Sequence, residues 1–341
     1  MKAKRSWYYT VPAAVCLLAC TLMGYYYLAS SFSSQEATVY VYIDSDDNLD
    51  SVTAKLAPIA ESHSLSGFNC LARYAGYGDH IRSGRYAIAP GERTYNVFRV
   101  LKNGQQSALR LTIPESRTMD RLAGVLSRKL MLDSTLLAQS LQSEDFCQQY
   151  GYDTATIACL FVPDTYEVYW NISLEGLMTR MQKEHKRFWE NGRTAKAEAL
   201  GLTENEVCTV ASIIDEETAN NSEKPMIAGM YLNRLEAGMP LQADPTVKFA
   251  MKQFEIRRIY HDMLFFDSPY NTYRNTGLPP GPIKIASVKG IDAVLNRTAH
   301  DYLYMCAKED FSGTHNFART YKEHLDNAAR YSRALNQRGI K

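Results

Sequence analysis

The sequence lacks a strong charge of either sign. Its 341 residues include 38 basic and 37 acidic side chains, which give a net charge of +1 at pH 7. No long basic run stands out, so the electrostatic patch that grips nucleic-acid phosphates is missing and a nucleic-acid partner is not expected. Hydrophobic residues make up 45% and charged residues 22%, an ordinary globular composition. The length allows two or three domains.

The seven cysteines include no CxxC motif and no Cys/His spacing typical of zinc sites, so we expect no metal. Cys16 and Cys20 lie in an N-terminal apolar run. The others are odd in number, which leaves at least one thiol unpaired in a monomer. Cys147 and Cys159 could form a disulfide or be buried free thiols.

Tryptophan is also scarce, with 3 residues against 23 tyrosines. Tyrosine stacks on sugar and base faces, but it is also common in strands and cores. The tyrosine count alone therefore does not indicate a ligand.

The N-terminus has a long uncharged run, from Ser6 to Gln35, that follows three basic residues. Residues 7–30 would span about 36 Å as a helix, enough to cross a bilayer. Aromatic residues lie at both ends, as at membrane interfaces. These features predict a single transmembrane anchor at 7–30 in the inner (cytoplasmic) membrane. Because the basic residues precede the apolar run, residues 1–6 are predicted to form a cytoplasmic tail and the rest of the chain to lie on the outer, periplasmic side.

Two alternatives apply to this segment. It could be a signal peptide that is cleaved. It could also carry a lipid on Cys20, because "LLAC" loosely resembles a lipoprotein cleavage box, although the apolar run continues past that cysteine.

The chain after the anchor divides into a small module and a larger region. Residues 31–37 predict a polar linker, and 39–43 alternate like a strand. Helix-like spacing follows over 48–65, and 83–116 indicate strand, turn, helix, turn and strand. We therefore predict a small α+β module at about 38–112.

Residues 113–341 predict a mixed α+β domain. Helices are expected over 116–145, over 174–236 with breaks near 191–193 and 221–225, and over 318–337. Strands are expected at 301–308 and, as a strand or loop, at 158–170, whereas the Pro- and Gly-rich residues 240–284 indicate loops.

A stretch at 207–219, "VCTVASIIDEETA", places three acids after an apolar run. Val207, Val210, Ala211 and Ile214 share one face of a helix. Glu217 lies about 20° from Val210 at ~100° per residue and continues that face. A carboxyl on an apolar wall loses hydration, and its pKa rises toward the value that a general acid needs at pH 7.

The neighbouring acids point elsewhere. Asp215 lies about 140° from Val210 and Glu216 about 120° the other way, so both are predicted to face solvent. Because Asp215 and Glu217 diverge, a second catalytic acid would have to come from another segment.

Alternatives exist for each of these acids. Asp164 and Asp244 are candidates for a second acid, but both could equally form turns or helix caps. Glu217 itself could simply end the helix, or form an ion pair with an arginine such as Arg234.

Five segments in one order resemble the MltG/YceG-like endolytic murein transglycosylase family. They are "LFVPDTYEVY" (160–169), "ASIIDEETA" (211–219), "YLNRLEAGMPLQADPTVKFAM" (231–251), "SPYNTYRNTGLPPGPI" (268–283) and "GTHNFARTYKEH" (313–324). The match covers about 155–324 strongly. Residues 84–105 resemble the family's LysM-like subdomain more loosely, and a single N-terminal anchor also fits the family.

The resemblance implies that the second acid of an E-x-E segment is catalytic, which is Glu217 here, in a YceG-like catalytic domain over 113–341. The family's first acid is commonly Glu, whereas this chain has Asp215. The outward direction expected for Asp215 argues that this departure does not affect the chemistry.

The resemblance further implies a lytic transglycosylase, a carbon–oxygen lyase. It cuts between MurNAc and GlcNAc within peptidoglycan glycan strands, leaves 1,6-anhydroMurNAc ends and needs no cofactor. It also implies that the protein ends the elongation of nascent strands and contacts wall synthases of the elongation machinery.

The loops offer donors and acceptors that suit sugar hydroxyls and acetamides. The candidate substrate-binding residues are Asn233, Gln242, Asp244, Asn271, Tyr273 and His315. Each could instead be structural: Asn233 with Arg234 could tie two helices, Asp244 could hold its loop, and His315 could bond Glu217 or a loop carbonyl.

Two other functions use the same features. A hydrolytic muramidase with the same acid would add water instead of closing the anhydro ring. A non-catalytic peptidoglycan-binding scaffold for wall synthases would keep the LysM-like module without the chemistry.

Overall fold

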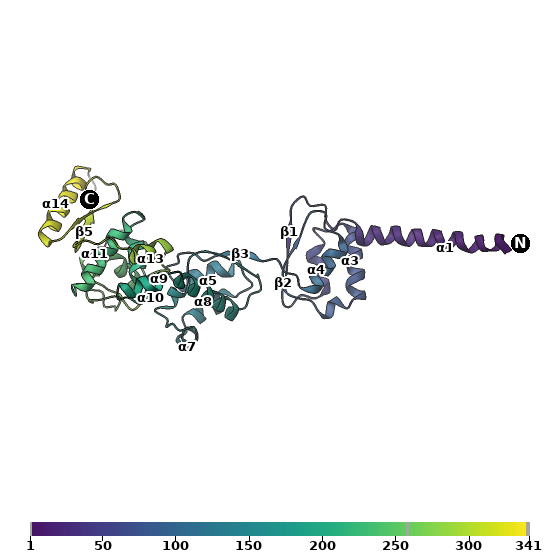
Figure 1. Cartoon of the computed structure of the whole chain (residues 1–341), viewed down its shortest axis with the longest axis horizontal. Helices are drawn as coiled ribbons and strands as arrows, with labels where there is room; N and C mark the ends of the chain where they lie inside the picture. The colour runs from purple at the N-terminus through teal and green to yellow at the C-terminus, as the bar shows by residue number, and fades with distance from the viewer. Residues whose placement is uncertain (1, 257–258, 339–341) are drawn as a thin grey trace. The chain divides into compact units, whose positions relative to one another are not determined.

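The computed structural model describes residues 2–256 and 259–338 (Figure 1). Residue 1 of the expected tail lies outside the described residues, as do residues 257–258 and 339–341 of the expected catalytic domain. The chain forms two compact units. The first contains the chain up to Leu111 with Lys129–Met131 and Glu167–Ile172, and the second contains the remainder. The fold is mixed α+β; the domain boundaries drawn from the sequence stay a prediction.

The N-terminal run is helical. Helix α1 (Lys2–Gly24) continues into a π-helical turn, η1 (Tyr25–Ala29). Tyr9–Ala29 has a mean hydropathy of 1.6, and this segment is long and apolar enough to cross a membrane. A signal sequence would have the same properties.

The expected polar linker at 31–37 is wrong for its first residues. The side chain of Phe32 is fully buried in the core of the first unit, and Ser33 is buried as well. The backbone N–H of Phe32 donates to the carbonyl of Glu92 at 2.7 Å, and Ser31 forms a β-bridge with Arg93. The prediction failed because the local sequence is largely polar. Local composition does not reveal that the aromatic side chain of Phe32 packs into a core formed by other segments.

The core of the first unit is built mainly from two paired strands and the helices that follow them or lie between them. Strands β1 (Val39–Ile43) and β2 (Gly84–Ile88) pair antiparallel, with Val41 opposite Tyr86. The predicted helical stretch at 48–65 is two helices, α2 (Leu49–Leu56) and α3 (Ser62–Tyr74), separated at Pro58, which cannot donate a backbone hydrogen bond. The short turn η2 (Tyr77–Asp79) and helix α4 (Thr94–Asn103) complete the core.

Gly67 in α3 allows η1 to pack directly against this helix. A Cβ at that position would collide with the carbonyl oxygen of Tyr27. Ser30 adds a hydrogen bond of 3.0 Å to Nε2 of His63. The end of the apolar N-terminal segment is therefore part of the first unit.

Short elements precede the centre of the second unit. Strands β3 (Leu109–Thr112) and β4 (Thr165–Val168) form a two-stranded sheet. The other elements here are α5 (Met119–Ser127), α6 (Ser134–Leu141), α7 (Glu144–Gln148), η3 (Ile157–Leu160), α8 (Leu174–Glu190) and α9 (Arg193–Ala199). The predicted break near 191–193 is confirmed.

The main core of the second unit surrounds α10 (Glu204–Glu217), which packs with α11 (Lys224–Glu236) and α13 (Val288–Leu295). The expectation of loops over 240–284 is partly wrong, because α12 (Asp244–Ala250) and η4 (His261–Phe265) lie there. Pro245 stands in the first turn of α12, where its missing N–H costs nothing.

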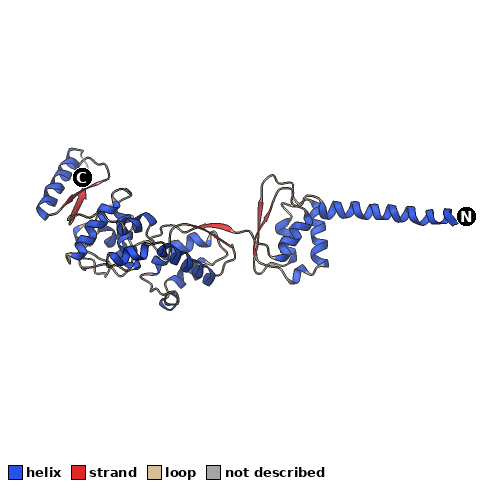
Figure 2. Ribbon diagram, in the orientation of Figure 1, coloured by secondary structure: helices blue, strands red, loops and turns tan. Residues whose placement is uncertain are grey.

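A hairpin and a long helix close the second unit. Strands β5 (Tyr304–Ala307) and β6 (His315–Ala318) pair antiparallel, and α14 (Tyr321–Gln337) lies beside them (Figures 1 and 2). The strand and helix expected at this end are confirmed, but β6 was not anticipated. This hairpin brings the segment around His315 to the site described next.

Candidate active site

Helix α10 delivers Glu217 to the site. Its start is fixed by a capping box, in which Thr203 and Glu206 satisfy each other's free backbone N–H groups. Val207, Val210 and Ile214 are buried as the apolar stripe predicts. The helix ends at Glu217, and Thr218 caps it in an extended conformation, with its N–H bonded to the carbonyl of Ile214.

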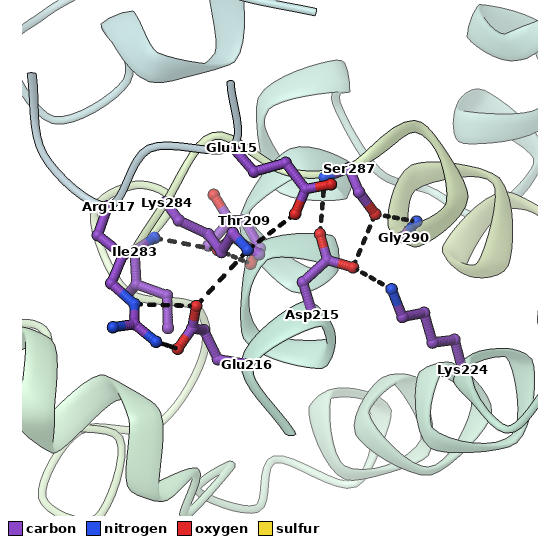
Figure 3. Close-up of polar contacts among 11 residues, drawn as sticks. Glu115, Arg117, Thr209, Asp215, Glu216, Lys224, Ile283, Lys284, Ser287 and Gly290 are labelled. Atoms are coloured by element: carbon purple, nitrogen blue, oxygen red, sulfur yellow. Dashed lines mark hydrogen bonds and ion pairs between the residues drawn. The ribbon is translucent and has the colours of Figure 1, made fainter. Parts of the chain in front are cut away.

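The prediction that Asp215 faces solvent is wrong. Its side chain is only 2% exposed and forms an ion pair with Nζ of Lys224 at 2.6 Å. The backbone N–H and hydroxyl of Ser287 donate to the same carboxylate at 2.6 and 2.8 Å (Figure 3). A Cβ on Gly290 would lie 2.5 Å from Oδ1 of Asp215, so α13 packs tightly here. Asp215 is therefore a structural link between three helical segments.

Glu216 was also predicted to face solvent, but it forms ion pairs with two basic side chains. Arg117 donates to both of its carboxylate oxygens, at 3.1 and 2.7 Å, and Lys284 lies 3.6 Å away (Figure 3). Lys284 also binds Glu115 at 3.0 Å. A helix pattern gives the direction of a side chain but not the oppositely charged groups that distant segments place there.

Glu217, unlike Asp215 and Glu216, lines a cavity with a volume of about 480 Å³. The lining comes from α10, α11, α12, the loop around Tyr273, the β5–β6 hairpin and α14. The lining residues are Glu217, Met230, Tyr231, Arg234, Leu241, Gln242, Asp244, Tyr273, Tyr304, Met305, Cys306, Ala307, His315, Tyr321 and His324.

The electrostatics of Glu217 suit an acid that works near neutral pH. Its side chain is half-buried, and burial raises the pKa of Glu217 from 4.5 to about 7. The phenol of Tyr231 donates a 3.0 Å hydrogen bond to Oε1 and opposes this shift, whereas the negative charge of Asp244 adds to it. Near pH 7 the carboxyl can therefore exist in both protonation states, as acid–base chemistry requires.

Three predicted substrate-binding residues meet on one side of the cavity. The phenol of Tyr273 donates to Oδ1 of Asp244 at 2.6 Å, and burial together with this bond raises the pKa of Tyr273. Gln242 has a left-handed backbone with φ of 53°, and its Oε1 accepts a 2.7 Å bond from Arg234. Asp244, one of the two candidates for a second acid, thus lines the cavity, whereas the exposed Asp164 does not.

The remaining candidates differ in position. His315 lines the cavity, but its Nδ1 contacts Glu223 at 2.9 Å and not Glu217 or a loop carbonyl. Asn233 and Asn271 are absent from the lining. The amide of Asn233 donates to the carbonyls of His300 and Tyr302, and the buried Asn271 donates to those of Leu264 and Phe266. Substrate contact by any of the six residues stays a prediction.

Sequence reasoning missed several lining residues. Tyr231 bonds Glu217, while Tyr304 stacks with His324 at a ring separation of 5.5 Å. Arg234 was considered only as a structural residue, and its guanidinium donates to the carbonyls of Pro240 and Leu303. The high tyrosine count was the signal available, but it did not say which tyrosines meet.

All seven cysteines are free thiols, including the buried Cys147 and Cys159. Among residues 2–256 and 259–338, no group of three His, Cys, Asp or Glu side chains is placed to hold a metal ion.

A sequence model of the YceG-like family matches residues 41–330. The chain is 28% identical over 319 residues to an endolytic murein transglycosylase of Bacillus subtilis (strain 168), and the match covers 89% of this chain and 87% of that protein. It is 28% identical over 345 residues to an endolytic murein transglycosylase of Streptococcus pneumoniae (serotype 2, strain D39). That match covers 90% of this chain but 62% of the longer relative.

A solved structure gives the same relationship. The crystal structure of a yceG-like protein from Listeria monocytogenes aligns with a TM-score of 0.55 and 25% sequence identity. The alignment covers 86% of this chain and 99% of the other.

Proposed function

Because this chain belongs to the YceG-like family, we propose that it is an endolytic murein transglycosylase acting on the glycan strands of peptidoglycan. The observation that carries this proposal is a single half-buried carboxyl, Glu217, in the wall of a cavity, with its pKa raised to about 7. The names of the two relatives point to the same reaction.

We assign the acid and base roles to Glu217. In its protonated form it donates to the glycosidic oxygen between MurNAc and GlcNAc, and the bond to C1 breaks through an oxocarbenium-like state. The carboxylate then takes the proton of the MurNAc C6 hydroxyl as that oxygen attacks C1. The products are a 1,6-anhydroMurNAc end and a free GlcNAc hydroxyl, and no water is consumed.

The cavity wall supports this chemistry. Asp244 is exposed at the cavity and accepts a hydrogen bond from Tyr273. Its negative charge raises the pKa of Glu217 and so favours the protonated acid. The same charge would stabilise the positive charge that develops on the sugar. We propose that Gln242, Asp244, Tyr273 and His315 contact the glycan. Asn233 and Asn271 would support these loops and act on substrate only indirectly.

The rest of the molecule would place this site at the wall. We propose that residues 7–30 anchor the protein in the inner membrane, that 38–112 form a LysM-like module, and that the catalytic unit faces outward. In this position the enzyme would end the elongation of nascent glycan strands beside wall synthases. The apolar Tyr9–Ala29 helix and the family relationship support this arrangement.

Analysis of the products tests the reaction. The full-length protein in detergent would digest isolated glycan strands, and mass spectrometry would identify the new ends. We expect internal cuts with 1,6-anhydroMurNAc ends for the wild type and a loss of at least ~10²-fold in rate for Glu217→Gln. Glu206→Gln is a matched control on the same helix, because Gln can keep the capping box.

Two other outcomes would contradict the proposal and identify a different function. Reducing MurNAc ends would identify a hydrolytic muramidase. A folded wild type that binds strands without cleaving them would identify a scaffold.

A further inference from the structure

Glu223 and His315 form a buried pair beside the catalytic cavity. Glu223 precedes helix α11, and His315 is the first residue of β6. Oε1 of Glu223 accepts the backbone N–H of His315 at 2.6 Å, and Oε2 lies 2.9 Å from Nδ1 of the same residue. Both carboxylate oxygens therefore bind one residue. The side chains of Glu223 and His315 are 8% and 16% exposed, and only His315 lines the cavity.

The carboxyl of Glu223 lies at the start of a helix and is buried. It stands at the N-terminus of the 13-residue helix α11, where the helix dipole is positive. Burying a carboxylate is costly unless hydrogen bonds satisfy it, and here both bonds come from His315.

A carboxylate fixes the tautomer of the imidazole. An ionised carboxylate only accepts hydrogen bonds, so when Glu223 is ionised its 2.9 Å contact requires Nδ1 of His315 to be the donor. In the neutral ring Nε2 then has a free lone pair. Within the described residues this nitrogen has no hydrogen-bond partner, and the ring belongs to the cavity wall.

We infer that Glu223 is a positioning residue that holds His315 with Nε2 as an acceptor, and that Nε2 binds a hydroxyl of the glycan. This inference rests on the proposed function, because it requires a glycan in the cavity. It adds Glu223 to the site, although Glu223 itself does not line the cavity. Proton transfer to and from the glycosidic bond stays with Glu217.

Binding can be separated from cleavage in a Glu217→Gln background. The full-length protein in detergent, labelled with ¹⁵N at its seven histidines, would be titrated with a tetrasaccharide of alternating GlcNAc and MurNAc. Calorimetry gives Kd, and the ¹⁵N shifts report the tautomer. We expect an Nδ1–H ring whose Nε2 signal moves when the sugar binds.

Two substitutions isolate the pair. His315→Asn keeps a donor near the Nδ1 position for Glu223 but removes Nε2, so Kd should rise about 10-fold with little change in Tm. In Glu223→Gln the amide can donate to Nδ1, which should favour the opposite tautomer and also weaken binding about 10-fold. His261→Asn, at an exposed histidine outside the cavity lining, is the matched control.

Three results would overturn the inference. They are an Nε2–H tautomer with Glu223 intact, unchanged Kd in His315→Asn, and no measurable binding when His315 is present. None of these decides the proposed function, which depends on the ends that wild-type protein produces.

Discussion

At the scale of single residues, opposing influences set the pKa of Glu217. Burial and the charge of Asp244 raise it, and the hydrogen bond from Tyr231 lowers it. The acid is therefore not simply a carboxyl on an apolar wall. A tyrosine 14 residues further along the chain moderates the effect of burial.

This balance predicts a pH dependence. Glu217 must be protonated to donate, so the rate should fall as pH rises through about 7. Tyr231→Phe removes a bond that favours the charged form, so the pKa should rise and the alkaline limb should move to higher pH. The measurement is the pH dependence of kcat/KM for glycan cleavage, which reports the pKa of the acid in the free enzyme.

A second tyrosine serves as the control for this experiment. Tyr166 is a buried tyrosine of the same unit that lies outside the cavity, and its phenol bonds the carbonyl of Val162. Tyr166→Phe should leave the limb in place. A limb that stays fixed or moves to lower pH in Tyr231→Phe would contradict the assigned interaction.

At the scale of elements, helix α10 carries acids with different tasks. Asp215 ties α10 to the start of α11 and to the start of α13, and Glu216 ties it to Arg117 and Lys284. Glu217, one position further, is the residue left to face the cavity. These ion pairs fix the end of the helix and so hold the direction of Glu217.

This arrangement predicts a large stability loss for Asp215→Asn. The variant leaves the buried ammonium of Lys224 without a charged partner, which should reduce the free energy of unfolding by about 3–5 kcal/mol. Urea unfolding of the soluble region from residue 30 measures this change.

The control uses an exposed ion pair. Lys186 and Glu190 are 73% and 65% exposed, and Glu190→Gln should change the free energy of unfolding by less than about 1 kcal/mol. Equal effects of the two substitutions would show that the Asp215 pair is no more important than a surface contact.

At the scale of the whole molecule, the apolar N-terminal segment and the first unit are continuous. Phe32 is fully buried in the core of that unit, and Gly67 makes room for η1. A soluble fragment that starts at residue 37 would therefore lack part of a folded core.

Truncation tests this continuity. We expect the first unit to melt about 10 °C or more lower in a 37–341 fragment than in a 30–341 fragment, because loss of a buried Phe costs about 3–5 kcal/mol. Phe32→Ala in the longer fragment should reproduce most of this loss, as calorimetry would show. Tyr74→Ala, at a 93% exposed site of the same unit, should not. Equal melting of both fragments would exclude a structural role for residues 30–36.

The sequence by itself determined the features that depend on neighbours along the chain. They include the apolar N-terminal helix, the β1 and β2 strands, the apolar stripe of α10 and the direction of Glu217. They also include the family, because its motifs are short and ordered. These follow from periodicity and composition, which act within a few turns or residues.

Only the tertiary structure determined which residues far apart in the sequence contact each other. Ser287 reaches Asp215 across 72 positions and His315 reaches Glu223 across 92, and neither pairing has a local signal. The same holds for the burial of Phe32 and for the tyrosines around the cavity. A buried charge needs a partner from whatever segment the packing brings near, so its environment depends on the complete fold.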